Sequence, residues 1–245
     1  NSLTYMYDNL GLPQLSKLEE ILNDESITEE ETILSKVYYN MDRIVHHRKK
    51  YHAGIAMSSL RIANYESISG CNNNGWYNGD GMLYVYTDAN QFDKSYFQYA
   101  DPYKRPGTTV DTQRRESLSI AYGYEYFPTQ EFVGGVNLEN KYSVGAMSLE
   151  AFHNNVPSEV KDTSGGVSHP IHDCDLKAKK AWFMFDEEIV ALGADINATG
   201  DAEVITVVEN HKISGDAYID GNKIAAYESG KKETASWAAI EGIGG

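Results

Sequence analysis

The stretch AWFMFDEEIVALGADI, residues 181–196, decides the fold class. Its apolar residues follow a two-residue period in short runs at 181–185 and 188–196, and this pattern predicts two strands. Asp186 and Glu187 lie between the runs and are expected to form the turn of a hairpin.

The same period recurs along most of the chain. We expect further strands at residues 81–87, 131–136, 142–152, 203–213 and 217–220, with a tight turn at Asp220–Gly221 after the last of these. Regularly spaced strands without helices between them indicate an antiparallel β-sandwich and not a parallel α/β sheet.

The first 45 residues have a helical period instead. Residues 13–23 place their leucines and Ile21 on one helical face, with Pro13 suited to a first turn. Residues 28–45 begin with Thr28 and Glu31 at the spacing of a capping box and continue with an amphipathic stripe. We therefore expect two helices before a β-rich body.

Composition excludes several classes of partner. The 245 residues carry a formal net charge of −15, which argues against nucleic acid or an anionic membrane as a ligand. No apolar run approaches the ~20 residues of a membrane-spanning helix. Two cysteines are too few for a disulfide scaffold, and the sequence leaves open whether they pair.

Three short motifs carry candidate chemistry. HPIHDCD, residues 169–175, has enough donors for a metal, but an extended segment places His169 and His172 on opposite faces, so we interpret it as a polar patch leading into a strand. VHHRKKYH, residues 45–52, follows a predicted helix, where cations favour the negative end of the helix dipole. The carboxylate in GDG, residues 79–81, is interpreted as a turn residue.

The stretch NYESISGCNNNGWYNGDG, residues 64–81, is rich in amide side chains. Amides donate and accept hydrogen bonds at once and so match the hydroxyl groups of sugars, while Trp76 and Tyr77 offer flat faces to a pyranose ring. Asparagines equally supply turn geometry. The residues alone leave both interpretations open.

A longer set of motifs resembles polysaccharide lyase family 8, which includes hyaluronate, chondroitin AC and xanthan lyases. The resemblance rests on Arg61, on NYE at 64–66, on GW at 75–76 with GDGM at 79–82, and above all on DPYKRPGTTVD at 101–111. It continues through FVGG, KKAWFMFDEEIVALGADI and SWAAIEGIGG, and so extends from about residue 40 to the end of the chain.

The resemblance implies an architecture. Residues 1–47 are expected to be the last helices of an (α/α) toroid. Residues 48–245 are expected to form the central antiparallel β-sandwich, a supersandwich of the galactose-mutarotase type, truncated at its C-terminal end. The fold class is therefore mainly β with a short helical lead.

It also implies a reaction, the β-elimination of polysaccharides that contain uronic acids. In the family an Asn neutralises the carboxylate and a His–Tyr pair moves the protons, with no metal or cofactor. That trio belongs to the toroid, so we expect no catalytic residue in this chain. The implied partners are an acidic polysaccharide and the upstream toroid, in a secreted, cell-surface or periplasmic bacterial protein.

What remains for this chain is one wall of the substrate cleft. The residues that the resemblance assigns to the wall or its support are Arg61, Asn64, Glu66, Ser69, Asn72, Asn73 and Trp76. Glu66 matches the carboxylate of a Glu-x-x-Asn pair, but Ser69 replaces its amide, and Cys71 replaces a usual Glu. Alternatively, Glu66 forms an ion pair with Arg61 or a neighbouring cation that fixes the loop, and the two roles are compatible. Trp76 is expected to be a packing residue and not a platform for a sugar. The alternative function for the chain is a non-catalytic carbohydrate-binding or structural sandwich.

Overall fold

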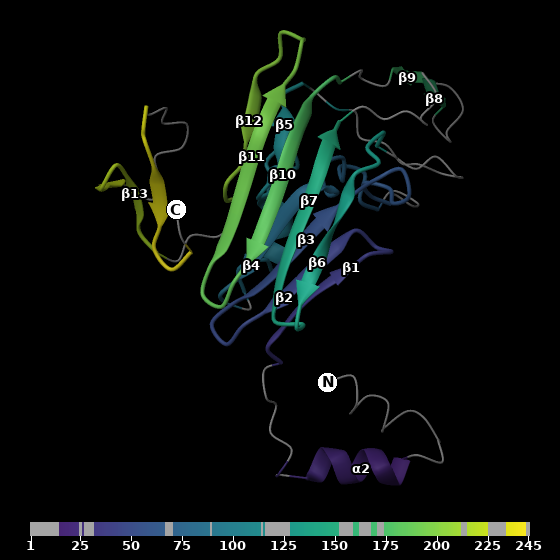
Figure 1. Ribbon diagram of the computed structural model, residues 1–245, viewed down its shortest axis with the longest axis vertical. Helices are drawn as coiled ribbons and strands as arrows, with labels where there is room; N and C mark the ends of the chain where they lie inside the picture. The colour runs from purple at the N-terminus through teal and green to yellow at the C-terminus, as the bar shows by residue number, and fades with distance from the viewer. Residues whose placement is uncertain are drawn as a thin grey trace. The chain divides into compact units, whose positions relative to one another are not determined.

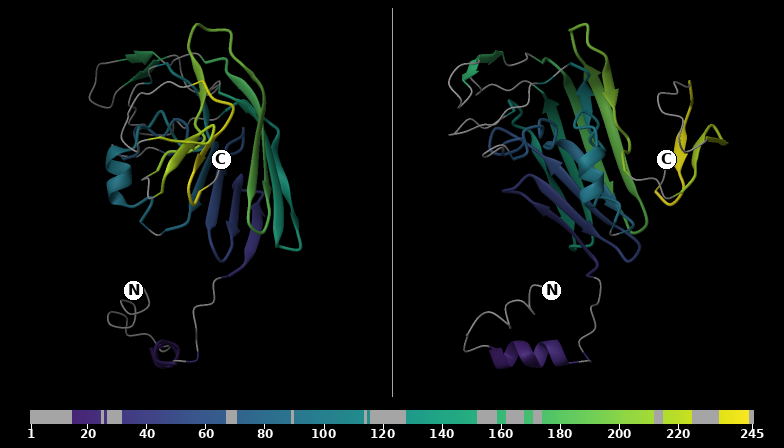
Figure 2. Two further views of the ribbon diagram at one scale, coloured as in Figure 1. Left: turned by 90° about the vertical axis from the view of Figure 1, so that its left-hand side faces the viewer. Right: turned by 180° about the vertical axis from the view of Figure 1, so that it is seen from behind.

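The structure is a computed structural model (Figures 1 and 2). It describes residues 15–24, 26, 32–66, 71–88, 90–113, 115, 128–151, 159–161, 168–170, 174–211, 215–224 and 234–243. The chain divides into two units, Asn1–Thr32 and Ile33–Gly245. In the first unit, helix α2 spans Leu15–Asn23.

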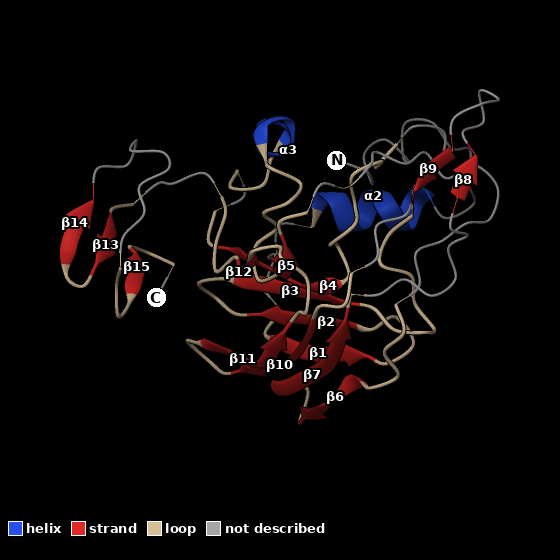
Figure 3. Ribbon diagram, turned by 90° about the horizontal axis from the view of Figure 1, so that it is seen from above, coloured by secondary structure: helices blue, strands red, loops and turns tan. Residues whose placement is uncertain are grey.

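The second unit is built on two four-stranded antiparallel sheets. One has the order β1-β2-β3-β4, formed by Leu34–Tyr38, Arg43–His47, His52–Met57 and Asp80–Tyr86. The other has the order β11-β10-β7-β6, formed by Ile189–Asn197, Lys177–Met184, Tyr142–Glu150 and Val133–Leu138. Figure 3 shows the two sheets as stacked layers.

The core lies between these layers. Residues of β7 alternate between buried and half-buried, as expected for a strand with one face against the core. Both sheets contribute to one cluster of buried side chains, in which Trp182 is the largest: Val37, Ile44, Ile55, Met57, Met147, Leu149, Ala178, Trp182 and Met184. Burial of this apolar surface is the main force that holds the sandwich together.

Smaller elements surround the sandwich. Strand β5 (Thr109–Asp111) pairs with β12 (Val204–Thr206), and β8 (Glu159–Lys161) pairs with β9 (Ser168–Pro170). Strands β13 (Ala217–Ile219), β14 (Asn222–Ile224) and β15 (Ala238–Ile240) form a third antiparallel sheet. Helix α3 (Lys94–Tyr99) follows β4 and is capped by the side chain of Asp93.

The motif at 101–111 is a scaffold that docks onto β4. The N–H of Leu83 donates to the carbonyl of Pro106 at 2.8 Å, and that of Gly107 donates to the carbonyl of Val207 at 2.7 Å. Gly107 has φ +81°, and a Cβ there would lie 2.8 Å from the backbone nitrogen of Leu83. Only glycine fits this turn without displacing β4.

Most predicted strands are confirmed. Those expected at 81–87, 131–136, 142–152, 181–185, 188–196 and 217–220 correspond to β4, β6, β7, β10, β11 and β13. The hairpin closes where expected, with the N–H of Phe185 donating to the carbonyl of Glu188 at 2.9 Å. Asp220 (φ 46°) and Gly221 (φ 82°) form the predicted turn. The strand expected at 203–213 is shorter: β12 ends at Thr206.

The helix predicted over 28–45 is wrong in its described part. Residues 34–38 and 43–47 are β1 and β2, paired in antiparallel register from Leu34–His47 to Tyr38–Arg43. Val37 and Ile44 face the core, whereas Met41 is exposed in the turn between them. The apolar residues between 33 and 45 fit both the helical period and the two-residue period of strands. The pairing of β2 with β3 favours the strands.

The domain boundary shifts for the same reason. The predicted division after residue 47 falls inside the first sheet, and the second unit instead begins at Ile33. The expected helix at 13–23 is confirmed as α2 from Leu15 onward, while Thr28 and Glu31 lie outside the described residues. That residues 1–32 belong to a toroid stays a prediction.

Candidate functional site

The candidate site is the loop that joins β3 to β4, residues 58–79, described at 58–66 and 71–79. Asn64 ties its two limbs together. Its side chain is 1% exposed, and Nδ2 donates to the carbonyl of Trp76 at 3.2 Å and to Oδ1 of Asp80 at 2.5 Å. Asn64 therefore supports the loop from inside.

Aromatic side chains form the floor of the loop. Trp76 is 5% exposed and packs with Tyr65, Tyr77 and Val110, and its ring centroid lies 5.1 Å from that of Tyr103. Trp76 is thus a packing residue, as expected. At Gly75 a Cβ would lie 2.6 Å from the ring of Tyr65, so the floor requires glycine there.

A buried ion pair fixes this floor to β5. Nη2 of Arg115 contacts the two carboxylate oxygens of Asp111 at 3.1 and 3.2 Å, and its Nε donates to the hydroxyl of Tyr77 at 3.2 Å. Burial raises the pKa of Tyr77 far above its ordinary value. Tyr77 therefore stays neutral and serves as an anchor.

Arg61 lies at the start of the loop. The carboxylate that it pairs with is that of Asp42 and not that of Glu66. Nη2 of Arg61 contacts Oδ1 of Asp42, in the β1–β2 turn, at 2.9 Å. The other oxygen of Asp42 accepts a hydrogen bond from the hydroxyl of Ser59 at 2.5 Å. The Arg61 side chain remains 53% exposed, so the guanidinium is oriented by a buried partner and still faces solvent.

The outer side of the loop is polar. Glu66 and Asn72 are exposed, and Nδ2 of Asn72 donates to the backbone carbonyl of Glu66 at 2.9 Å. Asn73 is half-buried, and Ser69 lies outside the described residues. The structure thus brings Glu66 and Asn72 together on a rigid floor. Guanidinium, carboxylate and amide groups in such a setting bind carboxylates and hydroxyls.

The motif at 169–175 offers no metal site in its described part. Cys174 is buried, and burial raises the pKa of its thiol to about 11, so the thiolate that a metal needs is disfavoured. Cys71 is exposed, and neither of these two described cysteines forms a disulfide. Within the described ranges, no three His, Cys, Asp or Glu side chains are placed to hold an ion.

The basic motif at 45–52 follows no helix, so the dipole interpretation is wrong. It forms the end of β2, the start of β3 and the turn between them, where the N–H of Arg48 donates to the carbonyl of Tyr51 at 2.9 Å. Arg48 and Lys50 instead pair with Asp186 and Glu187 of the β10–β11 turn, at 3.4 and 3.2 Å.

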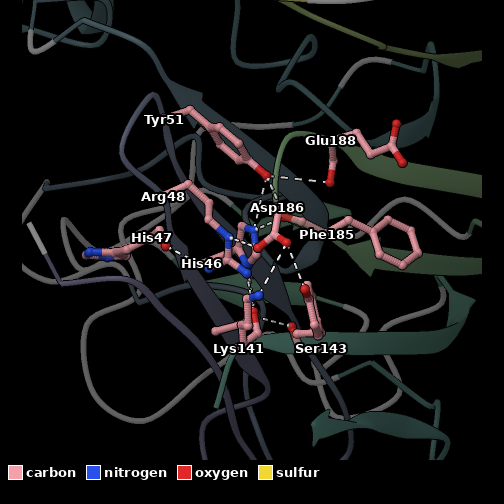
Figure 4. Close-up of polar contacts among 11 residues, drawn as sticks. His46, His47, Arg48, Tyr51, Lys141, Ser143, Phe185, Asp186 and Glu188 are labelled. Atoms are coloured by element: carbon pink, nitrogen blue, oxygen red, sulfur yellow. Dashed lines mark hydrogen bonds and ion pairs between the residues drawn. The ribbon is translucent and has the colours of Figure 1, made fainter. Parts of the chain in front are cut away.

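Figure 4 shows how this hairpin is joined to the second sheet. His46 is 0% exposed, with Nε2 2.8 Å from the carbonyl of Phe185 and Nδ1 2.9 Å from the hydroxyl of Ser35. Since a carbonyl only accepts, Nε2 carries the hydrogen and Nδ1 accepts from Ser35. Burial lowers the pKa of His46 to about 4, so a neutral imidazole links the sheets.

Comparison with known proteins decides the family. The model described as polysaccharide lyase family 8, super-sandwich domain, matches residues 33–244.

The chain belongs to polysaccharide lyase family 8.

Relatives within family 8 include lyases with different named substrates. Hyaluronate lyase HylB of Enterococcus faecalis is 38% identical over 190 residues, which cover 75% of this chain and 17% of that protein. Xanthan lyase of Bacillus sp. is 34% identical over 217 residues, 88% of this chain and 20% of that protein. The chain thus spans a fifth or less of the length of these two relatives.

Solved structures of family 8 lyases share the fold. Chondroitin AC lyase of Streptomyces coelicolor A3, in complex with chondroitin sulphate, superposes with a TM-score of 0.67 at 30% identity, covering 93% of this chain and 27% of that one. The predicted super-sandwich, mainly β and antiparallel, is confirmed. Across the part of the chain that the structure describes, no helix is long and apolar enough to cross a bilayer.

The buried charges that hold this family 8 loop are functional residues that sequence patterns do not identify. Asp42, Asp80 and Asp111 each carry a hydrogen bond or ion pair that fixes part of it, and Arg115 completes the set. Asp80 belongs to the GDG motif, whose pattern predicts a turn residue, but it begins β4 and is 2% exposed. Of the others, only Asp111 lies in a motif that the sequence singles out, DPYKRPGTTVD at residues 101–111.

Proposed function

We propose that this chain is part of a lyase that cleaves polysaccharides containing uronic acids, of the hyaluronan, chondroitin or xanthan type, by β-elimination. The proposal draws on the named activities of the relatives and on the exposed polar face of the β3–β4 loop. The loop forms one wall of the substrate cleft. The chemistry belongs to an upstream helical toroid.

The observation that carries the proposal is the contrast between the two sides of the loop. Asn64 and Trp76 are buried and hold it, while Arg61, Glu66 and Asn72 face solvent. With a net charge of −15, the chain binds an anionic polymer only where a local cation offsets the field. Arg61 is the cation of this face, and its pairing with buried Asp42 orients it in advance.

In the reaction proposed, the C5–H and C4–O bonds of the sugar break and a C4–C5 double bond forms. The upstream groups take the C5 proton and return one to the departing oxygen. The wall holds the sugar in the geometry this requires. A polymer substrate of this size implies that the parent protein is secreted or held at the bacterial cell surface or in the periplasm.

A second candidate is a carbohydrate-binding or structural sandwich without a catalytic partner. It is favoured by Ser69 and Cys71, which depart from the family pattern on the same loop. The two functions differ in one respect that can be tested. The lyase and a carbohydrate-binding sandwich both predict binding at the loop, whereas a structural sandwich does not, and only the lyase predicts unsaturated product once the helical domain is supplied.

Binding tests the shared part of the proposal. Arg61→Gln is expected to weaken binding of the chain to hyaluronan, chondroitin or xanthan by about tenfold, the loss of one charge-assisted contact. Isothermal titration calorimetry measures the change. Urea unfolding of the variant separates it from any loss of stability caused by leaving Asp42 with fewer partners.

Lys50→Gln is the matched control, because it removes the same charge at an 80% exposed site in the β2–β3 turn. It is expected to bind as the wild type does. Equal weakening by the two variants would mean that the polymer responds only to net charge, and the loop would then not be its binding site.

A further inference from the structure

Two ionisable side chains lie beneath the candidate loop, and the proposed reaction uses neither. Asp80 is the first residue of β4 and is 2% exposed. Lys180 comes from β10 in the opposite sheet and is 6% exposed. Charges are rarely buried this deeply unless they are paired and hydrogen-bonded, so the contacts of both groups call for an explanation.

The carboxylate of Asp80 determines the orientation of Asn64. Its Oδ1 accepts from Nδ2 of Asn64 at 2.5 Å, and the same Nδ2 reaches the carbonyl of Trp76 at 3.2 Å. Oδ1 of Asn64 is buried and has no hydrogen-bond partner among the described residues. The orientation of the amide that joins the two limbs of the loop therefore depends on two acceptors, of which only Asp80 can carry charge.

Lys180 provides the opposing charge. Its Nζ donates to the carbonyl of Gly107 and lies 3.4 Å from the carbonyl of Asp80, so it spans from β10 to the start of β4. The positive charge of Lys180 favours the ionised form of Asp80. Lys180 also lies 5.8 Å from the centre of the Trp182 ring, which helps to hold a cation in the core.

We propose that Asp80 is a positioning residue for the β3–β4 loop: its ionised carboxylate, supported by Lys180, holds Asn64 and thereby presents Glu66 and Asn72 to the polysaccharide. The inference rests on the proposed function for its ligand. It adds a residue that acts through Asn64 without touching the sugar.

The arrangement makes the loop sensitive to pH. Burial raises the pKa of Asp80 to about 7 and lowers that of Lys180 to about 8. Arg115 favours the ionised Asp80, and Asp111 opposes it. When Asp80 takes up a proton, the acceptor that orients Asn64 loses its charge. Polysaccharide binding is therefore expected to strengthen as pH rises through about 7.

Asp80→Asn tests the inference directly. Calorimetric affinity for the polysaccharide that the wild type binds is measured from about pH 5 to about pH 8, a range that spans the protonation of Asp80 and ends where Lys180 loses its charge. The wild type is expected to gain affinity across this range. The variant is expected to bind about tenfold more weakly at the upper end, with no gain as pH rises. Unchanged affinity and profile would overturn the proposal.

Asp186→Asn is the matched control, because it makes the same change at a 51% exposed carboxylate of the β10–β11 turn. It is expected to keep the wild-type profile. Lys180→Met is the second variant if Asp80→Asn does not fold. Removing the cation raises the pKa of Asp80, so the midpoint of the binding profile is expected to move to higher pH, a shift that a merely structural role does not produce.

Hydrogen exchange of residues 64–80 separates this inference from the proposed function. Protection of this segment is expected to fall in Asp80→Asn but not in Asp186→Asn, whether or not sugar binds. A wild type that binds none of the three polysaccharides would refute the proposed function, and exchange alone would then decide whether Asp80 orders the loop. Equal protection in both variants would refute the positioning role.

Discussion

Single buried polar side chains decide how the loops of this domain are held. Asp42, His46 and Asn64 are each 2% exposed or less, and each makes hydrogen bonds to a segment distant in sequence. An unpaired polar group in such a place costs more free energy than its hydrogen bond contributes. These residues therefore specify which segments meet.

His46 makes stability depend on pH. Its folded pKa is about 4, below the ordinary histidine value of 6.5, so unfolding takes up a proton as pH falls between these values. Acidification from pH 6.5 to about 4 is therefore expected to cost about 3 kcal/mol of unfolding free energy through this residue. His46→Gln should remove that part of the slope, as measured by urea unfolding across the range.

His52→Gln serves as the control, since it makes the same change at a half-buried position of β3. It should leave most of the acid sensitivity in place. If His46→Gln keeps the full wild-type slope, the neutral imidazole does not link the two sheets in the way described.

Some of the site could be predicted residue by residue, and some could not. The motif at 64–81 predicts four residues of the site, Asn64, Glu66, Asn72 and Trp76. Only the structure shows that Asn64 and Trp76 are buried supports, whereas Glu66 and Asn72 are exposed. The partner of Arg61 could not be predicted, because Asp42 is close to it only after β1 and β2 pair. A carboxylate in a turn looks the same in sequence whether it is exposed or buried.

The β1–β2 hairpin is the element that sequence patterns misassigned. Its turn, residues 39–42, has neither glycine nor proline, and Asp42 instead adopts φ 50°. Asn40 and Asp42 are the turn's only signals, and seven of the eight apolar residues at positions 33–45 resemble a helical stripe. Strands β7 and β10 are nine and eight residues long and therefore show a clear two-residue period, whereas β1 and β2 have five residues each.

If these residues form the β1–β2 hairpin, truncating Val37 and truncating Met41 should have different effects on the free energy of unfolding. Val37→Ala is expected to cost about 2 kcal/mol of unfolding free energy, because its side chain is buried in the core. Met41→Ala is expected to change it by no more than about 0.5 kcal/mol, because Met41 is 57% exposed. Denaturant unfolding of both variants gives the comparison, and similar costs at the two positions would support the helix.

At the scale of the whole molecule, two stacked sheets carry a loop whose inner side is fixed and whose outer side is polar. The fold class followed from strand periodicity and from the long motif at 101–111, which docks onto β4. The boundary of the sandwich could not be predicted, since it depended on the misassigned hairpin. The relatives place this chain in a family of lyases several times its length.

The most direct test of the account is an elimination assay on the purified chain. Hyaluronan, chondroitin and xanthan are incubated with it, and the ultraviolet absorbance of the unsaturated uronate product is followed, first alone and then with the upstream helical domain. No product is expected from the chain alone, and product is expected once the helical domain is added. Product from the chain alone would place the catalytic groups within it and contradict the assignment of the β3–β4 loop as a cleft wall.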